Sequence, residues 1–326
     1  MAYLSALSAR RLAMLFLFFA GTYFGVTAQV NAEAPMLKKQ GPGYYRMMLG
    51  DFEVTALLDG TLDLPVNRLL NHIEGPEVDK VLAAQSLKSP LETSYNAYLV
   101  NTGEKLVLID TGAGNLLGPT LGNMLQNLKA AGYSPEQVDE VYLTHMHNDH
   151  MGGLMTGGQR AFPNAILRAD KGDADHWFSA EEMEKARPGQ KMFFTGAQAS
   201  VSPYMKAGKF SAFEGNSMLA KGIRSVVTRG HTPGHSVYVV ESKGQKMVIL
   251  GDMMHVAAIQ FERPVVGIQF DSDSNVASVQ RASLYEQAAN DQAIFAASHV
   301  SFPGLGRVRK NGTGYVWLPV NYSALR

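Results

Sequence analysis

The sequence of 326 residues contains no cysteine, and this absence sets the first limits on its chemistry. Without thiols the chain cannot form disulfides, use a thiolate nucleophile, build a cysteine-based zinc finger or ligate an iron–sulfur cluster. A transition metal would have to be held by His, Asp or Glu side chains. The nine histidines are therefore the first residues to place.

Excess charge is also lacking, because 29 Lys and Arg balance 29 Asp and Glu. A neutral chain gives no electrostatic reason to expect a nucleic-acid partner. Hydrophobic residues make up 46% and charged residues 18%, which is typical of a folded globular protein. No repeat and no Pro/Gly/Ser-rich linker divides the chain, so we expect one domain over residues 35–326.

The N-terminus resembles an export signal. Arg10 and Arg11 precede a 17-residue uncharged run, 12–28, which ends in small and polar residues. This layout predicts a secretory signal peptide over 1–34, cleaved after Ala34 or alternatively after Ala32. The other interpretation is an uncleaved membrane anchor, but the run is at the short edge of a span of about 20 residues. We expect a periplasmic or secreted protein that has no membrane contact after cleavage.

Hydrophobic periodicity predicts alternating strands and helices in each half of the mature chain. The Asp59-Gly60 pair, after a strand over 52–58, is a turn signal. Expected strands are 98–101, 106–109, 141–143, 165–168, 224–228, 236–241, 246–250, 293–297 and the edge strand 315–319; expected helices are 119–131, 170–178 and 274–290, with a capping box at 179–182. This alternation indicates an α/β layered sandwich with its chemistry on loops at strand ends.

The central segment has the pattern H-x-H-x-D-H, formed by His145, His147, Asp149 and His150. A strand-to-loop transition can direct His145 and His147 at one point, because residues i and i+2 share a face. The turn that follows can direct Asp149 and His150 at a second point nearby. Imidazole and carboxylate ligands without sulfur suit zinc, manganese, iron or cobalt.

Four more polar residues, outside the H-x-H-x-D-H segment, lie where predicted strands begin or end. His235 precedes a strand, whereas Asp110, Asp252 and His299 each follow one. The ordered series resembles the five motifs of the metallo-β-lactamase superfamily. The resemblance implies a four-layer αβ/βα sandwich with two divalent metal ions, most simply zinc, in which Asp252 and Asp149 serve catalysis. It implies that His145, His147 and His235 hold the first ion, that Asp149, His150 and His299 hold the second, that Asp252 bridges them, and that Asp110 orients a ligand loop.

A closer resemblance covers nearly the whole mature chain. The segments 43–46, 49–52, 90–94, 118–122, 271–274 and 319–323 are similar to those of the methyl parathion hydrolases, secreted organophosphate hydrolases of the same superfamily, whose relatives hydrolyse aromatic lactones such as dihydrocoumarin. This resemblance implies a homodimer and a pocket that encloses an aromatic leaving group. It also implies attack by a hydroxide held between the two ions.

The resemblance assigns seven residues to the substrate pocket, namely Trp177, Phe193, Leu69, Leu117, His255, Ile268 and Phe270. Bulk at His255, Ile268 and Phe270 should narrow the space for the substituents of a tetrahedral phosphotriester. A flat aromatic lactone or aryl ester needs less room, so we expect such small molecules as substrates, with organophosphate triesters as the alternative. His231 is expected to be structural, beneath the loop of His235. A diiron redox protein, a nuclease and a non-catalytic metal-binding module are less favoured alternatives.

Overall fold

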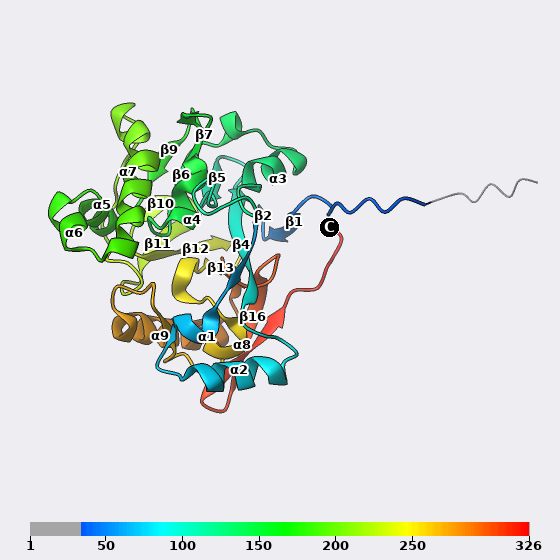
Figure 1. The fold of residues 1–326 in the computed structure, drawn as a ribbon. Coiled ribbons are helices and arrows are strands. Elements are labelled where there is room, and N and C mark those ends of the chain that lie inside the picture. The colour runs from blue at the N-terminus through cyan, green and yellow to red at the C-terminus, as the bar shows by residue number, and fades with distance from the viewer. Residues whose placement is uncertain (1–33, 326) are drawn as a thin grey trace, which may run out of the picture. The chain divides into compact units, whose positions relative to one another are not determined.

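Two β-sheets face one another in the computed structural model, which describes residues 34–325 (Figure 1). Residues from Gln40 onward form one compact unit, and residues 34–39 contain no helix or strand. The six-stranded sheet has the order β1 (Tyr44–Leu49), β2 (Phe52–Leu64), β4 (Leu91–Asn101), β5 (Leu106–Ile109), β6 (Glu140–Tyr142), β9 (Ile166–Arg168). The seven-stranded sheet has the order β10 (Met218–Ala220), β11 (Ile223–Val227), β12 (Ser236–Ser242), β13 (Gln245–Ile249), β15 (Ile294–Ala296), β16 (Leu305–Asn311), β17 (Gly314–Pro319).

The central strands are buried on both faces, and their successive side chains enter different cores. In β5, Leu108 packs toward the helices outside the first sheet, whereas Val107 and Ile109 pack between the two sheets. In β13, Met247 packs between the sheets and Val248 packs beneath the long helix outside the second sheet. Three successive hydrophobic layers therefore separate four structural layers.

Helices cover the outer faces of both sheets (Figure 1). Helices α3 (Met124–Ala130) and α7 (Lys191–Lys206) contribute Leu128 and Val201 to the core outside the first sheet, and α9 (Ser274–Asp291) contributes Tyr285 to the core outside the second. The helices are α1 (Val66–Leu69), α2 (Gly75–Ala84), α3 (Met124–Ala130), α4 (Asn148–Met151), α5 (Lys171–Trp177), α6 (Ala180–Lys185), α7 (Lys191–Lys206), α8 (Ala257–Gln260) and α9 (Ser274–Asp291); short strands β3 (Leu70–Asn71), β7 (Met155–Thr156), β8 (Gln159–Arg160) and β14 (Gly267–Ile268) pair outside the main sheets. The expected αβ/βα sandwich is confirmed.

Most expected elements are present, with small shifts at their ends. Helices α5 and α9 and all the strands expected from 224 to 319 are confirmed, and β17 is an edge strand as expected. The Ser179 side chain accepts from the Glu182 backbone N–H at the start of α6, as the capping pattern predicts. The helix expected from residue 119 begins only at Met124, because Pro119 and Thr120 form a turn and Gly122 has φ +89°, which is not a helical conformation. The 16-residue α7 was not expected.

The turn expected at Asp59-Gly60 is wrong, because β2 continues through both residues as a β-bulge. Gly60 has φ +149°, and a Cβ there would lie 2.0 Å from the carbonyl oxygen of Thr120. The bulge directs the buried Asp59 carboxylate toward the neighbouring loop, where it accepts from the backbone N–H groups of Ala113, Gly122 and Met124. It therefore fixes the loop that contains Leu117.

Parallel pairing of strands brings the predicted ligand residues together at one edge of the sandwich. Strand β5 is parallel to β6 in the first sheet, and β13 is parallel to β15 in the second. The carboxyl ends of such strands meet at one edge, and loops leave from there. In residues 34–325 no helix combines the length and apolar character needed to span a bilayer. The expected signal peptide lies, apart from Ala34, outside the described residues.

Candidate metal centre

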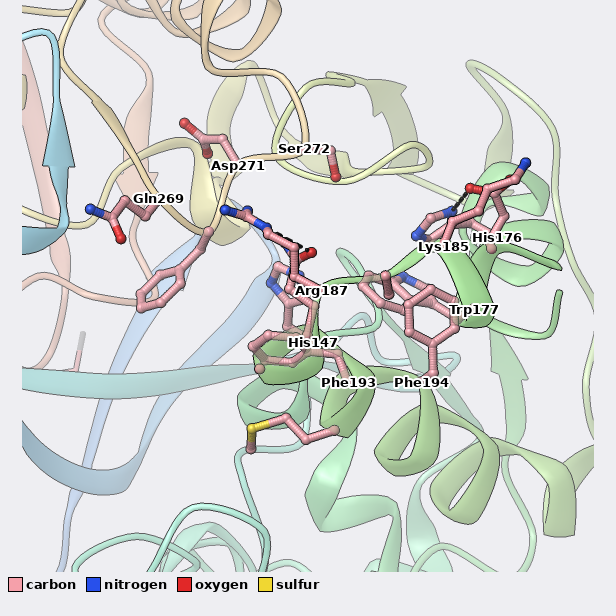
Figure 2. Close-up of a pocket in the computed structure, with 16 residues that line it drawn as sticks. His147, His176, Trp177, Lys185, Arg187, Phe193, Phe194, Gln269, Asp271 and Ser272 are labelled. Carbon is pink, nitrogen blue, oxygen red and sulfur yellow. Dashed lines mark hydrogen bonds and ion pairs between the residues drawn. The ribbon is translucent and has the colours of Figure 1, made fainter. Parts of the chain in front are cut away.

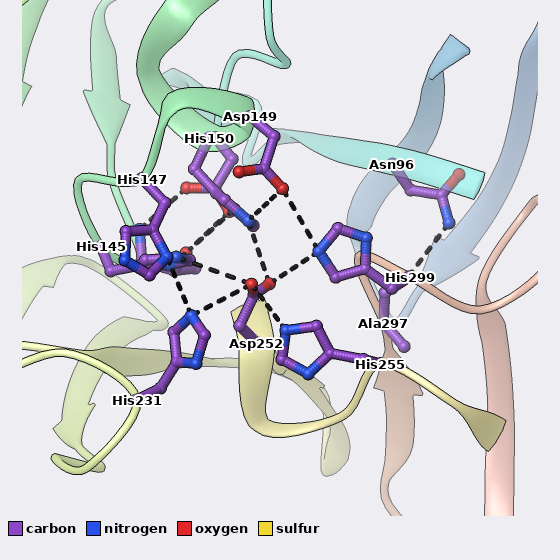
Figure 3. A network of polar contacts seen from close by, with 12 residues as sticks. Asn96, His145, His147, Asp149, His150, His231, Asp252, His255, Ala297 and His299 are labelled. Carbon is purple, nitrogen blue, oxygen red and sulfur yellow. Dashed lines mark hydrogen bonds and ion pairs between the residues drawn. The ribbon is translucent and has the colours of Figure 1, made fainter. Parts of the chain in front are cut away.

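Loops at the carboxyl ends of three strands carry six of the candidate ligands. The loop after β6 and the first turn of α4 provide His145, His147, Asp149 and His150, and the segment after β13 provides Asp252. The loop after β15 provides His299. Residues more than 150 positions apart in the sequence thus meet across the two sheets (Figure 3).

The Asp252 carboxylate lies at the centre of this cluster (Figure 3). Its Oδ1 is 3.0 Å from Nε2 of both His150 and His299. Its Oδ2 lies near the Nε2 atoms of a second set of residues: His255 at 3.0 Å, His231 at 3.2 Å and His145 at 3.6 Å. Asp149 Oδ2 completes one side, at 3.2 Å from His150 Nε2 and 3.4 Å from His299 Nε2.

The ligand atoms form two groups that share Asp252, each with its atoms within 4.8 Å of one another. One group is His145, His147, His231 and Asp252; the other is Asp149, His150, Asp252 and His299. Buried atoms in both groups, including His145 Nε2, His150 Nε2 and Asp252 Oδ1, have no hydrogen-bond partner. Buried polar atoms normally have hydrogen-bond partners. Unpaired atoms whose lone pairs converge in two groups are therefore suited to bind two cations. The groups support a dinuclear centre for divalent ions.

Outer contacts orient these lone pairs. His150 Nδ1 is 2.8 Å from Oδ2 of the buried Asp110, and His231 Nδ1 is 2.8 Å from Oδ1 of the buried Asp271. His299 Nδ1 is 3.3 Å from the carbonyl oxygen of Ser94. A neutral imidazole that donates through Nδ1 keeps its Nε2 lone pair free. In each of the three rings that lone pair points toward Asp252, and Asp110 has the orienting position expected of it.

The expected ligand position of His235 is wrong, and His231 occupies it instead. His235 Nε2 accepts from the Asp252 backbone N–H at 3.0 Å, and its Nδ1 is 2.9 Å from Oγ1 of Thr228. Both ring nitrogens are therefore used within the fold. His231, expected to be structural, has Nε2 3.0 Å from Nδ1 of His147. The two histidines are four positions apart, and the loop between β11 and β12 turns the earlier one inward.

Burial and neighbouring charges set the proton affinities of the metal-free cluster. Burial, with the nearby His231, lowers the pKa of His147 to about 3. For His231 and His299, burial opposes protonation, but the Asp252 carboxylate outweighs it and raises each pKa to about 9. Metal ligation requires neutral imidazoles. Cations that bind here therefore displace protons from His231 and His299.

A cavity of about 190 Å³ adjoins both ligand groups. Four of the seven expected pocket residues line it, namely Leu117, Phe193, His255 and Phe270. Leu69 and Ile268 do not line this cavity and pack in the hydrophobic cluster of α1, α2 and β14. The sequence interpretation missed Leu62, Leu64, Tyr95 and Met192, which also line the cavity. No signal distinguished these residues, since apolar side chains in strands and helices are ordinary core residues.

A larger outer cavity of about 710 Å³ also adjoins Phe193 (Figure 2). It contains Trp177, as well as the exposed cationic side chains of Lys185 and Arg187. The two cavities share His147, Met192, Phe193 and Phe270. The Trp177 ring contacts His147 at a centroid distance of 5.4 Å, so the tryptophan lies behind the ligand group and not over the inner cavity.

Known proteins are similar to this chain in sequence and fold. The family described as the metallo-beta-lactamase superfamily matches residues 91–299. The solved structure of AbOPH, a hydrolase in the beta lactamase superfamily, is 34% identical, covers 88% of this chain and 100% of its own, and has a TM-score of 0.84.

Two lactonases are also similar. AidC, a dizinc quorum-quenching lactonase, is 26% identical over 86% of this chain and 99% of its own, with a TM-score of 0.80. An N-acyl homoserine lactonase from Bacillus sp is 27% identical over 221 residues, which are 62% of this chain and 79% of the relative. The chain therefore belongs to the metallo-β-lactamase superfamily and is a metal-dependent hydrolase.

Proposed function

We propose that this protein is an exported dizinc hydrolase that opens aromatic lactones and cleaves aryl esters. The observation that carries the proposal is the inner cavity, which places aromatic and aliphatic side chains directly beside the two ligand groups. Phe193, Phe270 and Leu117 provide an apolar surface for one aromatic ring. A cavity of about 190 Å³ suits a small planar substrate.

The residues proposed to hold the ions are His145, His147, His231 and Asp252 for one, and Asp149, His150, His299 and Asp252 for the other. When bound, two divalent ions supply an activated water at neutral pH and polarise the substrate carbonyl. The chain itself orients the imidazoles through Asp110 and Asp271, and places the apolar rings of Phe193 and Phe270 along the cavity beside them. A phenolate, with a pKa near that of tyrosine at about 10, leaves without strong acid assistance.

N-acyl homoserine lactones are a second candidate substrate class, because two of the similar proteins are lactonases, one of them named for that substrate. The outer cavity has the volume to hold an acyl chain, and it shares four residues with the inner one. The inner cavity favours aromatic substrates over these, because its lining offers few partners for the amide group of such a lactone. Hydrolysis of organophosphate triesters at the same site is the alternative activity. His255 and Phe270 line the space that a triester's substituents need.

A substrate panel on the zinc-loaded mature protein tests the proposal. We expect kcat/KM for dihydrocoumarin and phenyl acetate to exceed that for N-hexanoyl homoserine lactone and for methyl parathion by about 10–200-fold, the range over which pocket shape discriminates. Asp252→Asn, loaded with zinc in the same way, is the control for activity at this centre. Faster turnover of the acyl homoserine lactone or of the triester would assign the site to that substrate class instead.

A further inference from the structure

Two polar side chains in the inner cavity, those of Tyr95 and His255, belong to neither ligand group. Tyr95 lies in β4 and lines the cavity together with Asp149, Asp252 and His299. Among the described residues its hydroxyl makes no hydrogen bond with the protein. The hydroxyl of Tyr98, in the same strand, does have a partner, since it donates to the carbonyl oxygen of Ala297 at 2.8 Å. A buried tyrosine usually finds such a partner, so the Tyr95 hydroxyl is available to a molecule in the cavity.

The residues before and after Tyr95 in the sequence both bond to the loop of His299, and this fixes the position of Tyr95 relative to the ligand cluster. The carbonyl oxygen of Ser94 lies 3.3 Å from His299 Nδ1, and the Asn96 backbone N–H donates to the carbonyl oxygen of Ser298 at 2.9 Å. The Tyr95 ring itself meets the His299 ring edge-on, with centroids 4.7 Å apart. Strand β4 and the loop of His299 therefore hold the phenol beside the reacting centre.

Apart from the Tyr95 phenol, the side chains that line the inner cavity offer few hydrogen-bond donors to a substrate. Leu62, Leu64, Leu117, Met192, Phe193 and Phe270 offer no strong hydrogen-bond donor. His255 already directs Nε2 at Asp252 Oδ2, at 3.0 Å. When the bond between the carbonyl carbon and the ester oxygen breaks, negative charge develops on that oxygen. In an apolar cavity an unpaired oxyanion is costly, and a single placed donor stabilises it.

We propose that Tyr95 is a catalytic residue whose hydroxyl donates a hydrogen bond to the leaving oxygen of the lactone or ester. The inference rests on the proposed function, since it requires a substrate with such an oxygen. Water supplies the atoms of the reaction: its oxygen bonds to the carbonyl carbon, one proton ends on the leaving oxygen and the other is released from the new carboxylic acid. Tyr95 keeps its own proton and lowers the energy of the charge that develops before protonation.

The test compares Tyr95→Phe with the wild type over acetate esters of phenols of increasing pKa, from 4-nitrophenol to phenol, and dihydrocoumarin. A lost hydrogen bond to the leaving oxygen matters more as that oxygen becomes more basic. We expect kcat/KM to fall less than about threefold for 4-nitrophenyl acetate and about 10–100-fold for phenyl acetate and dihydrocoumarin. Zinc content, measured by elemental analysis, should stay at two ions per chain.

Tyr98→Phe is the matched control, because it removes a hydroxyl from the same strand that is bonded to the backbone near His299 and does not line the cavity. We expect it to lower stability and to change all esters by the same factor. Binding of phenol to the zinc-loaded protein, followed by calorimetry, should weaken about 3–10-fold in Tyr95→Phe and be unchanged in Tyr98→Phe.

An equal loss on every ester in Tyr95→Phe would overturn the assignment to the leaving oxygen, and so would unchanged kinetics. A wild type that hydrolyses none of these esters would instead refute the proposed function.

Discussion

Two histidines in one loop, four residues apart, show how position decides chemistry at the residue scale. His231 donates through Nδ1 to Asp271 and directs Nε2 at the Asp252 carboxylate and at His147. His235 uses its two nitrogens in bonds to Thr228 and to the Asp252 backbone. We therefore expect His231→Asn to retain one zinc ion per chain in excess metal and to lose nearly all hydrolysis. Elemental analysis after dialysis against buffered zinc measures the stoichiometry.

His235→Asn is the comparison for that experiment. It loosens the support of the Asp252 backbone but removes no ligand, so two ions should still bind, with affinity about 10–100-fold weaker, as for other residues that orient a metal site. If His235→Asn lost an ion and His231→Asn kept both, the ligand assignment from the structure would be reversed.

A single sequence could place most of this site but could not choose between the two histidines. The H-x-H-x-D-H pattern fixes its own geometry, because strand periodicity and one helical turn direct four side chains locally. Asp252 and His299 were predictable because each directly follows a buried strand. The loop between β11 and β12 has no such periodicity, and the hydrogen bond between His235 Nδ1 and Thr228 depends on tertiary packing. The cavity residues Tyr95 and Met192 were missed for the same reason.

At the scale of elements, the bulge in β2 links a strand to the substrate cavity. Gly60→Ala should destabilise the protein by about 2–4 kcal/mol, because a Cβ would meet the carbonyl oxygen of Thr120 and φ +149° strains any other residue. The loop that contains Leu117 should shift with it and raise KM for dihydrocoumarin. Gly103→Ala is the matched control, since Gly103 also has positive φ but faces open space; it should cost about 1 kcal/mol and leave KM unchanged. Urea unfolding and steady-state kinetics measure both, and equal effects of the two variants would contradict this role of the bulge.

A second element-scale feature is the ion cluster that ties β6 to its neighbours. Glu140, buried in β6, bonds Arg168 of β9 at 2.6 Å and Lys105 before β5. Burial alone would raise the pKa of Glu140, but these two cations outweigh it and lower the pKa. Because the folded pKa lies below the unfolded value, the cluster stabilises the protein above about pH 4.3 and loses that stabilisation as the pH falls.

Glu140→Gln should therefore lower the free energy of unfolding by about 1–3 kcal/mol at pH 7, and by progressively less as the pH is lowered from 5 to 3. Denaturant unfolding of both proteins over this pH range gives the difference, which cancels the titration of all other groups. A difference that does not change with pH would show that packing, and not charge, accounts for the loss.

At the scale of the whole molecule, export is a prediction with a direct measurement. The layout of residues 1–34 predicts removal of the signal after Ala34, which leaves 292 residues beginning at Pro35. Mass spectrometry of the protein recovered from the periplasm or medium should find this chain, or one beginning at Glu33 if cleavage follows Ala32. A full-length chain in the membrane fraction would favour an anchor instead. Light scattering of the mature protein tests the expected homodimer.

The ligand groups also join the two sheets, and this couples metal binding to global stability. His145 and His147 follow β6 of the first sheet, whereas Asp252 and His299 follow strands of the second, so each ion would cross-link the halves of the sandwich. Cations bind the folded chain, whereas the unfolded chain has no preformed site for them. At a free metal concentration a hundredfold above Kd, each bound ion should therefore stabilise the protein by about 3 kcal/mol, and this stabilisation is lost when the ions are removed. Chelation should lower the melting temperature, and zinc should restore it.

The gain in melting temperature caused by zinc should depend on pH, and the direction of this dependence follows from the two protonated histidines. His231 and His299 hold protons in the metal-free protein, each with a pKa raised to about 9, so zinc must displace these protons at neutral pH. The melting-temperature gain from a fixed free zinc concentration should therefore grow as the pH rises from 6 to 9, and proton release should be measurable in weakly buffered solution. In His231→Asn both the gain and the number of protons released should fall, because one ion and one of the displaced protons are lost. A gain that is independent of pH, or the same in this variant, would show that the zinc ions bind away from the cluster around Asp252.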